Sequence, residues 1–396
     1  MLRQRGRVKV LGLLVGSLVF SGVAWADVSV ERSGSILVFP KIIADSTRDT
    51  IIQITNTSNQ LVRAHCFYVN AALTDPTARP GPLNPPLWLE VDFDITLTKQ
   101  QPTYWLVSEG RLVDPTDEPC EFEDNDCPYA GLDPGRIPPV VPDFVGELKC
   151  VEVDESNRPL SGNHLKGEAT LVSLPGPGLV AGDVSKYNAL AVLGTDNNGD
   201  DILVLGGGQC TGPGDQNGDI CGSDEDCGDS APCAFEYNAC PLTWILNHQA
   251  DESPDIILGP ESRVETELTV VPCTQNFETQ IPTTVTIQFL TWNDFESQFS
   301  FSTSITCWAN LNLGALGATP FTFDGQFPNP LGTSFLHTRM RAAGGTPFGM
   351  FMVAEEFRRQ APGELDPRTA AAFNLHIEGE RPNPDIITIP ADQLEP

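Results

Sequence analysis

One short segment concentrates the residues most suited to metal chemistry. "GDQNGDICGSDEDCGDSAPC", residues 214–233, holds six carboxylates and three cysteines and has no Lys or Arg. Asp215, Asn217 and Asp219 place oxygen ligands at positions 1, 3 and 5 of a tight loop, a spacing with which short side chains converge on a hard cation. Positions 7, 9 and 12 would add the Cys221 carbonyl, Ser223 and Asp226. The segment therefore predicts a calcium site.

The segment resembles two known kinds of calcium loop. Its ligand spacing is similar to that of an EF-hand loop, and its alternation of acidic residues with cysteines is similar to thrombospondin type 3 repeats. It departs from the EF-hand at Ile220, where that loop has Gly, and at Asp226, where it has Glu. The resemblance implies a short cysteine-framed calcium loop without flanking helices. A solvated acidic loop is the alternative, and zinc fits less well because only His248 lies near.

A second acidic loop lies upstream of the first. Asp196, Asn198 and Asp200 repeat the 1, 3, 5 spacing and run into an apolar stretch, so the loop resembles the calcium loop of an integrin-type propeller blade. Val204 stands where a later ligand is expected, and an Asn-Gly turn into a strand is the alternative. The surrounding residues 187–262 contain no Lys or Arg. A bound cation would relieve the repulsion between their carboxylates.

The N-terminus predicts export. Four basic residues precede an apolar run of about a dozen residues, and Ala24-Trp25-Ala26 fits the cleavage rule of a secretory signal peptide. The run is too short to span a bilayer. We therefore expect residues 1–26 to be removed, no integral membrane segment in the mature chain, and a secreted, periplasmic or outer cell-surface location.

The charge balance limits the partners. The chain carries 23 Lys+Arg against 53 Asp+Glu, a formal net charge of −30. We do not expect the protein to bind nucleic acid, because such binding needs a basic face that displaces counterions from phosphates. A cell-surface, carbohydrate or protein partner remains open.

An exported chain is oxidised, so its cysteines predict disulfides. Their number is odd, so at least one cysteine has no partner within the chain. That cysteine would be a free thiol or would link two chains in a covalent dimer. The eleven candidates are Cys66, Cys120, Cys127, Cys150, Cys210, Cys221, Cys227, Cys233, Cys240, Cys273 and Cys307.

The remaining pattern is that of an all-β protein. Residues 89–97 and 299–307 alternate apolar and polar side chains, as half-buried antiparallel strands do. Shorter β-rich runs are separated by turn residues, at 35–39, 50–55, 61–69, 147–153, 169–174, 189–193, 202–205, 264–271, 283–292 and 386–389. Only 353–360 and 367–373 look helical. We expect two or more antiparallel β-sandwich units, immunoglobulin-like or jelly-roll.

The expected organisation follows composition. Residues 50–70 read as strand, polar turn and strand, and resemble the opening hairpin of an immunoglobulin-like module of bacterial surface proteins. That resemblance implies an architecture and a bacterial source but no activity. We expect a signal peptide (1–26), a sandwich (27–112), a Pro-rich acidic linker (113–143), a second β domain (144–345) with an acidic Cys-rich insertion (206–240), and a mixed C-terminal segment (346–396).

These features favour a structural, adhesive or ligand-binding protein over an enzyme. No catalytic residues can be assigned, because the five histidines are scattered and neither a nucleophile elbow nor a zinc-protease motif occurs. The run "SGNH" at 161–164 matches the name of a hydrolase family only by accident. An exported hydrolase of polysaccharides is the alternative, suggested by Trp292, Asp294 and Glu296, which a strand end and turn also explain.

Overall fold

The computed structural model shows an all-β chain, with strands and two 3₁₀ turns in the part it describes. None of the helical segments in that part could cross a bilayer. The described residues are 28–75, 83–111, 135–157, 159–176, 180–194, 208–210, 213–216, 220–221, 227–230, 233–236, 241–251, 253–255, 257, 259–273, 284–316, 335–343, 349–359, 369–377 and 388–389.

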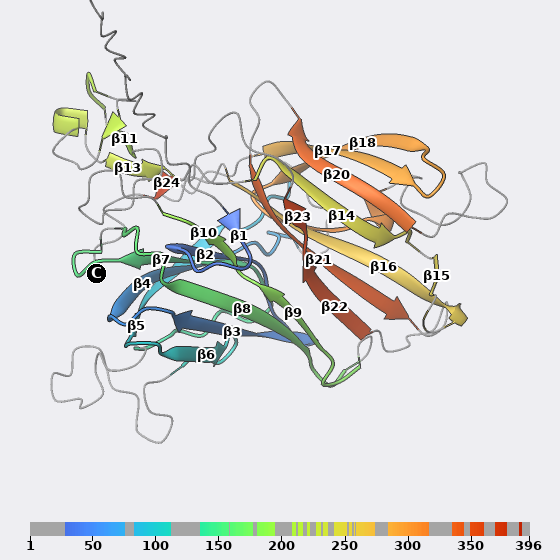
Figure 1. The fold of residues 1–396 in the computed structure, drawn as a ribbon, viewed down its shortest axis with the longest axis horizontal. Coiled ribbons are helices and arrows are strands. Elements are labelled where there is room, and N and C mark those ends of the chain that lie inside the picture. Colours follow the sequence, from blue (N-terminus) through green and yellow to red (C-terminus); the bar gives the residue numbers. More distant parts are fainter. Residues whose placement is uncertain are drawn as a thin grey trace, which may run out of the picture.

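The first part of the chain forms two antiparallel sheets, shown in blue and green in Figure 1. Sheet A has the strand order β1-β10-β2-β7-β4-β5, and sheet B has the order β6-β3-β8-β9. Their strands are β1 (Val28–Ser29), β2 (Ile36–Ala44), β3 (Arg48–Asn56), β4 (Val62–Asn70), β5 (Leu89–Leu97), β6 (Pro102–Leu106), β7 (Phe144–Val153), β8 (Leu165–Ser173), β9 (Val184–Asn188) and β10 (Leu190–Val192).

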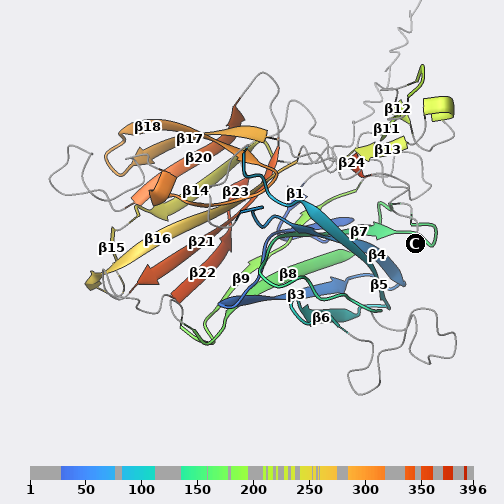
Figure 2. The same cartoon turned by 180° about the vertical axis from the view of Figure 1, so that it is seen from behind.

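The later part of the chain forms two further sheets, yellow to red in Figures 1 and 2. Sheet C has the order β18-β17-β20-β14-β23, and sheet D has the order β15-β16-β21-β22 with β19 beside β16. Their elements are β14 (Thr243–Gln249), β15 (Ser253–Asp255), β16 (Gly259–Pro272), β17 (Thr284–Asn293), β18 (Gln298–Thr306), β19 (Ala309–Asn312), the 3₁₀ turn η2 (Gly314–Leu316), β20 (Phe335–Ala343), β21 (Met350–Arg359), β22 (Thr369–Asn374) and β23 (His376–Ile377).

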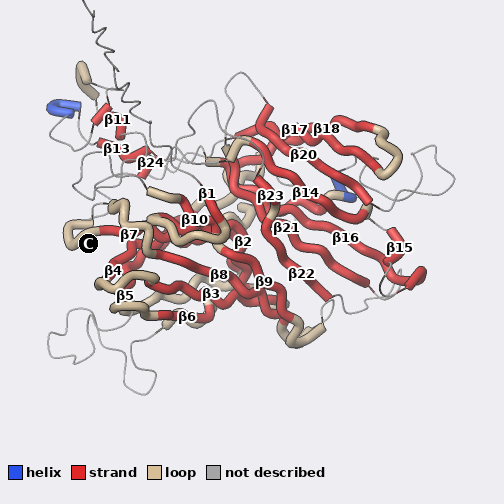
Figure 3. Tube along the Cα trace, viewed as in Figure 1, coloured by secondary structure: helices blue, strands red, loops and turns tan. Residues whose placement is uncertain are grey.

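A small sheet E accompanies the acidic segment. Its order is β12-β11-β13-β24. It lies apart from sheets C and D, on the side of sheet A (Figure 3). Its elements are β11 (Gly208–Cys210), β12 (Ile220–Cys221), the 3₁₀ turn η1 (Gly228–Ser230), β13 (Cys233–Glu236) and β24 (Thr388–Ile389).

The position of each strand explains its sequence pattern. All nine residues of β2 are buried, because sheet A is covered on both faces. Leu37 and Phe39 pack into the cluster shared with sheet B, whereas Ile36 and Val38 belong to a second cluster that includes sheets C and D. The strand β3 instead alternates over most of its length, since the described residues cover only one face of sheet B.

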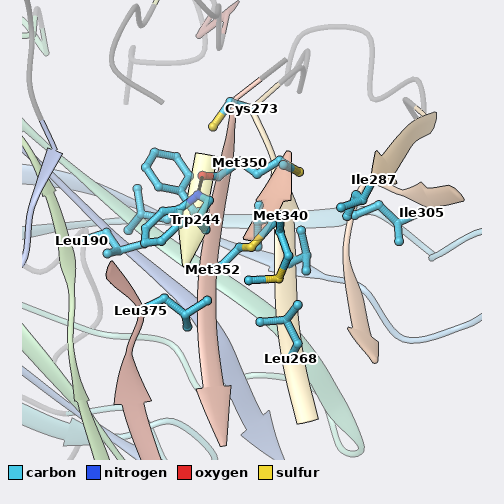
Figure 4. Close-up of a cluster of buried hydrophobic side chains, with 14 of the residues drawn as sticks. Leu190, Trp244, Leu268, Cys273, Ile287, Ile305, Met340, Met350, Met352 and Leu375 are labelled. Carbon is cyan, nitrogen blue, oxygen red and sulfur yellow. Dashed lines mark hydrogen bonds between the residues drawn. The ribbon is translucent and has the colours of Figure 1, made fainter. Parts of the chain in front are cut away.

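The second cluster joins the two halves of the molecule. Figure 4 shows Leu190 of β10 in the same apolar cluster as Trp244 of β14 and Met350 and Met352 of β21. The indole nitrogen of Trp244 donates a 2.7 Å hydrogen bond to the Met350 carbonyl. This satisfies the one polar group of a large buried side chain.

Buried charges also join the halves. A register shift in β2 next to Phe39 accompanies the placing of Lys41 against sheet D. Lys41 Nζ lies 2.8 Å from Glu355 and 3.1 Å from Glu267, and Arg48 of β3 also binds Glu355. Both cations lie over the ring of Phe357. Lys41 and Arg48 outweigh the effect of burial and lower the pKa of Glu355 to about 2, so it is ionised at neutral pH.

Two expectations about the chain are wrong. Residues 353–360 and 367–373 were expected to be helical, but their described parts, 353–359 and 369–373, lie in the strands β21 and β22. The expected boundary at residues 113–143 does not separate sheets either, because β7 to β10 complete sheets A and B. Tertiary pairing overrides local propensity in β21, which is hydrogen-bonded on both sides.

Candidate ligand-binding groove

The structure describes only part of the predicted calcium loops. Asp215 is exposed in a turn, and the backbone of Cys221 in β12 pairs with that of Gly208 in β11. The other ligands of the first loop, Asn217, Asp219, Ser223 and Asp226, lie outside the described residues, as do Asp196, Asn198 and Asp200 of the second. Among the described side chains there is no group of three or more His, Cys, Asp or Glu residues that could hold a metal ion.

The cysteines follow the expected chemistry in part. Cys66 and Cys150 form a disulfide between the paired strands β4 and β7. Cys227 and Cys273 are each engaged in a disulfide as well. Cys307, one of the candidates, is instead a buried thiol. Because it is only 1% exposed, a covalent dimer would have to use another cysteine. Cys120, Cys127 and Cys240 lie outside the described residues, whereas Cys210 and Cys233 face each other as backbone partners in sheet E.

The uncovered face of sheet B contains a hollow of about 410 Å³. Its floor consists of two rows of side chains that run across the strands β6, β3 and β8. The first row is Tyr104, Gln53 and Glu168, and the second is Pro102, Thr55 and Lys166. We call this hollow the sheet B groove; Thr57, Thr103, Arg111 and Gly167 complete its lining.

Strand alternation holds these side chains outward. Their neighbours Ile52, Ile54 and Trp105 are buried against sheet A. Gly167 also faces inward, where an added Cβ would lie 2.6 Å from Cζ of Phe39. A side chain at that position would push the sheets apart, so glycine keeps the floor of the groove close to sheet A.

The rim of the groove is an aromatic ring with a cation on it. Tyr104 is 65% exposed, a large value for an aromatic side chain. The guanidinium of Arg111 lies 5.5 Å from the ring centroid and donates hydrogen bonds to Thr103 Oγ1 (2.8 Å) and to the Tyr104 carbonyl (3.1 Å). Packing and hydrogen bonds therefore fix the position of Arg111 before any ligand arrives.

Some polar groups of the floor have an ion-pair or hydrogen-bond partner and others do not. Glu168 is the carboxylate among the lining residues, and Lys186 of β9 forms an ion pair with it. Lys166 donates a hydrogen bond to the Glu31 carbonyl (3.1 Å). The amide oxygen of Gln53 is buried and has no hydrogen-bond partner in the described part of the chain. The groove therefore presents hydroxyl, amide and cationic side chains next to an apolar ring.

A second polar cluster lies on the opposite face of sheet A. His65 contacts Asp94 (Nδ1–Oδ1 2.7 Å), which holds its ring in place on the sheet. Nearby, Lys149 pairs with Glu147. Burial, and then the negative charge of Asp92, raise the pKa of Glu90 to about 7. Because His65 pairs with Asp94 and Lys149 pairs with Glu147, we assign these four residues a structural role.

Residues of the two enzyme-like sequence features make structural contacts. Asn163 of the "SGNH" run bridges loops, since its amide exchanges hydrogen bonds with the backbone of Gly194 (2.7 and 2.8 Å). The expected turn at 292–296 is present, because β17 ends at Asn293 and the Asn293 side chain accepts hydrogen bonds from Phe295 and Ser297.

Sequence reasoning missed every residue of the groove. The strand at 50–55 was predicted, and its alternation already places Gln53 and Thr55 on one face. A solvent-facing tyrosine next to a buried tryptophan, as in Tyr104-Trp105, was a further signal. What the sequence does not contain is the register that brings β6 and β8 to either side of β3.

The comparisons with known proteins give no family. No family model matches the sequence, and no curated protein matches it. Among solved structures, "Crystal Structure of Thermotoga maritima 1070" shares 11% identity at a TM-score of 0.23 over 36% of this chain and 98% of that one. The apo form of Pleurotus ostreatus lectin shares 10% identity at a TM-score of 0.14 over 93% and 86% of the two chains. Similarities this low carry no argument about fold or function.

Proposed function

We propose that the protein is an exported binding protein that captures a polar ligand in the sheet B groove. One observation carries the proposal: an exposed Tyr104 stands beside outward-facing hydrogen-bonding side chains in a hollow of about 410 Å³. Apolar surface with a few fixed polar groups is the usual composition of a ligand site. The volume fits a small molecule or one to two units of a longer chain.

The charge of the groove supports binding over hydrolysis. Glycosidases of the common type need two carboxyl groups that flank the scissile bond. Within the described residues, the lining of the groove supplies Glu168 alone, and Lys186 already engages it. The proposal therefore favours the ligand-binding class over an exported hydrolase of polysaccharides.

The setting of the groove is proposed along with it. We propose cleavage after Ala26, a location outside the cytoplasm of a bacterium, and calcium bound by the acidic loop at 215–226. We also propose that sheets A and B, and sheets C and D, form two immunoglobulin-like or jelly-roll sandwiches. The antiparallel pairing of facing sheets over shared cores supports that architecture. N-terminal sequencing of the exported protein tests the cleavage and should begin at Asp27.

A ligand panel tests the binding function. The panel contains neutral cello-, malto- and chito-oligosaccharides, oligogalacturonate and short peptides, and binding is measured by thermal shift and isothermal calorimetry. At least one class should raise the melting temperature, because a ligand at a hundredfold excess over Kd stabilises the folded state by about 2.7 kcal/mol. Tyr104→Ala should remove the effect.

The control is a second exposed aromatic outside the groove. Phe295 is 46% exposed in the turn after β17, and Phe295→Ala should leave binding unchanged. Binding that survives Tyr104→Ala, or a panel in which nothing binds, would contradict the proposed function.

A further inference from the structure

We infer that the ligand of the sheet B groove is an acidic sugar, that is, a saccharide bearing a carboxylate such as a uronic acid. This inference rests on the proposed binding function. Three features of the groove support the inference. These are the free hydrogen-bond donors of Arg111, the positive charge around them, and the neutral polar residues of the lining.

Arg111 presents an open pair of donors. A guanidinium has five N–H donors in a planar fork. The two on Nη1 are directed at Thr103 and at the Tyr104 carbonyl. In the described part of the chain, Nε and Nη2 make no hydrogen bond, so the edge that they form is free for a bidentate contact. A carboxylate matches that edge in geometry and charge.

The charge of the groove also favours an anion. Arg111 and Lys166 line it, and Glu168 is neutralised by Lys186 across the strand pair. The chain as a whole carries a net charge of −30, which repels anions at long range. Exposed charges are screened beyond about 8 Å at physiological ionic strength, so the two nearby cations dominate within the groove.

The remaining lining residues suit hydroxyl groups. Gln53 lines the groove, although its amide oxygen is buried, and Thr55 and Thr57 offer hydroxyls. The exposed part of the Tyr104 ring can contact the C–H face of a sugar. A simple carboxylic acid would use only Arg111, whereas an acidic sugar would use all of these groups together.

The test compares one saccharide with and without its charge. Oligogalacturonate, its fully methyl-esterified form and acetate are titrated into the exported full-length protein by calorimetry. The free acid should bind, the ester should bind about tenfold to a hundredfold more weakly, and acetate should not bind measurably. Raising the salt concentration should weaken only the binding of the free acid.

Matched arginine variants locate the effect. In Arg111→Gln, the acid and the ester should bind with about equal affinity. Arg111→Lys should keep only part of the wild-type preference for the acid, because the planar fork is lost. Arg341→Gln, an exposed arginine on β20, is the control and should keep the preference. Melting curves confirm that each variant is folded.

The outcomes separate this inference from the proposed function. Equal affinity for acid and ester, with binding still lost in Tyr104→Ala, would overturn the acidic-sugar inference alone. A preference for the acid that survives Arg111→Gln would overturn it too. Absence of any Tyr104-dependent binding would overturn the proposed function as well.

Discussion

The pKa of Glu90 is strongly raised by its surroundings. Glu90 stands across sheet A in a row with Val69 and Glu147, next to the row of Asp92, and its pKa is raised to about 7 by burial and then by Asp92. A carboxyl group with a raised folded-state pKa contributes stability that is complete below its unfolded pKa and is lost as the pH rises through the folded value. Glu90 is therefore nearly neutral in its effect at pH 4, where it is protonated, and destabilises the folded state at pH 8, where it is ionised.

Glu90→Gln should remove this dependence, since an amide does not ionise. We expect the variant to match the wild type at pH 4 and to be about 1–2 kcal/mol more stable at pH 8.5, less than the full shift because Glu90 is partly exposed. Urea unfolding at the two pH values measures the difference. The exposed Glu109→Gln serves as the control, and an equal effect of both variants would refute the assignment.

At the scale of elements, β21 shows where sequence patterns succeed and fail. Alternation predicted 89–97 correctly as β5, and apolar runs predicted β2, β4 and β7. The segment "VAEEFRRQ" at 353–360 instead has the composition of a helix. In the strand, its charged residue Glu355 does not face solvent as it would on a surface helix. It is buried and forms ion pairs with Lys41 of sheet A and Arg48 of sheet B.

The groove was unpredictable for the same reason. Gln53, Tyr104 and Glu168 come from three strands that are far apart in the sequence, and only their register places them in one row. Short-range patterns specify which face a residue occupies but not which residues lie opposite it. Charged pairs between distant strands, such as Lys41 with Glu355, are equally invisible to such patterns.

Glu355→Gln should destabilise the protein by about 3–5 kcal/mol at pH 7, because it leaves two buried cations with one fewer anion. The folded pKa of Glu355 is about 2, so its contribution is present above the unfolded value and declines as the pH falls. The gap between variant and wild type should therefore narrow by about 2 kcal/mol at pH 3.

Denaturant unfolding at both pH values measures the gap. Glu168→Gln, which breaks the exposed pair with Lys186, is the control and should cost no more than about 1 kcal/mol. If the two variants lost the same unfolding free energy, the buried ion pairs of Glu355 would not stabilise the contact between the two halves of the molecule.

At the scale of the whole molecule, charge is the dominant feature. The protein carries a net charge of −30, and residues 187–262 contain no Lys or Arg. Repulsion within this region opposes compaction, and a divalent cation would reduce it. Ile220 and Cys221 of the acidic segment form β12, which pairs with β11 in sheet E.

Millimolar calcium should therefore raise the melting temperature by several degrees, and EDTA should lower it. Magnesium at the same concentration should have a smaller effect, because it requires a stricter octahedral geometry. Asp215→Asn should weaken the response to calcium. If neither calcium nor EDTA moved the melting temperature, the calcium proposal would fail.

The central claim is that the uncovered face of sheet B binds the ligand. Hydrogen exchange measured by mass spectrometry, with and without the strongest binder of the panel, tests it most directly. Peptides that cover β3, β6 and β8 should exchange more slowly in the complex, while those covering β17, β18 and β20 should be unchanged. Protection confined to sheets C and D, with none in sheet B, would contradict the claim.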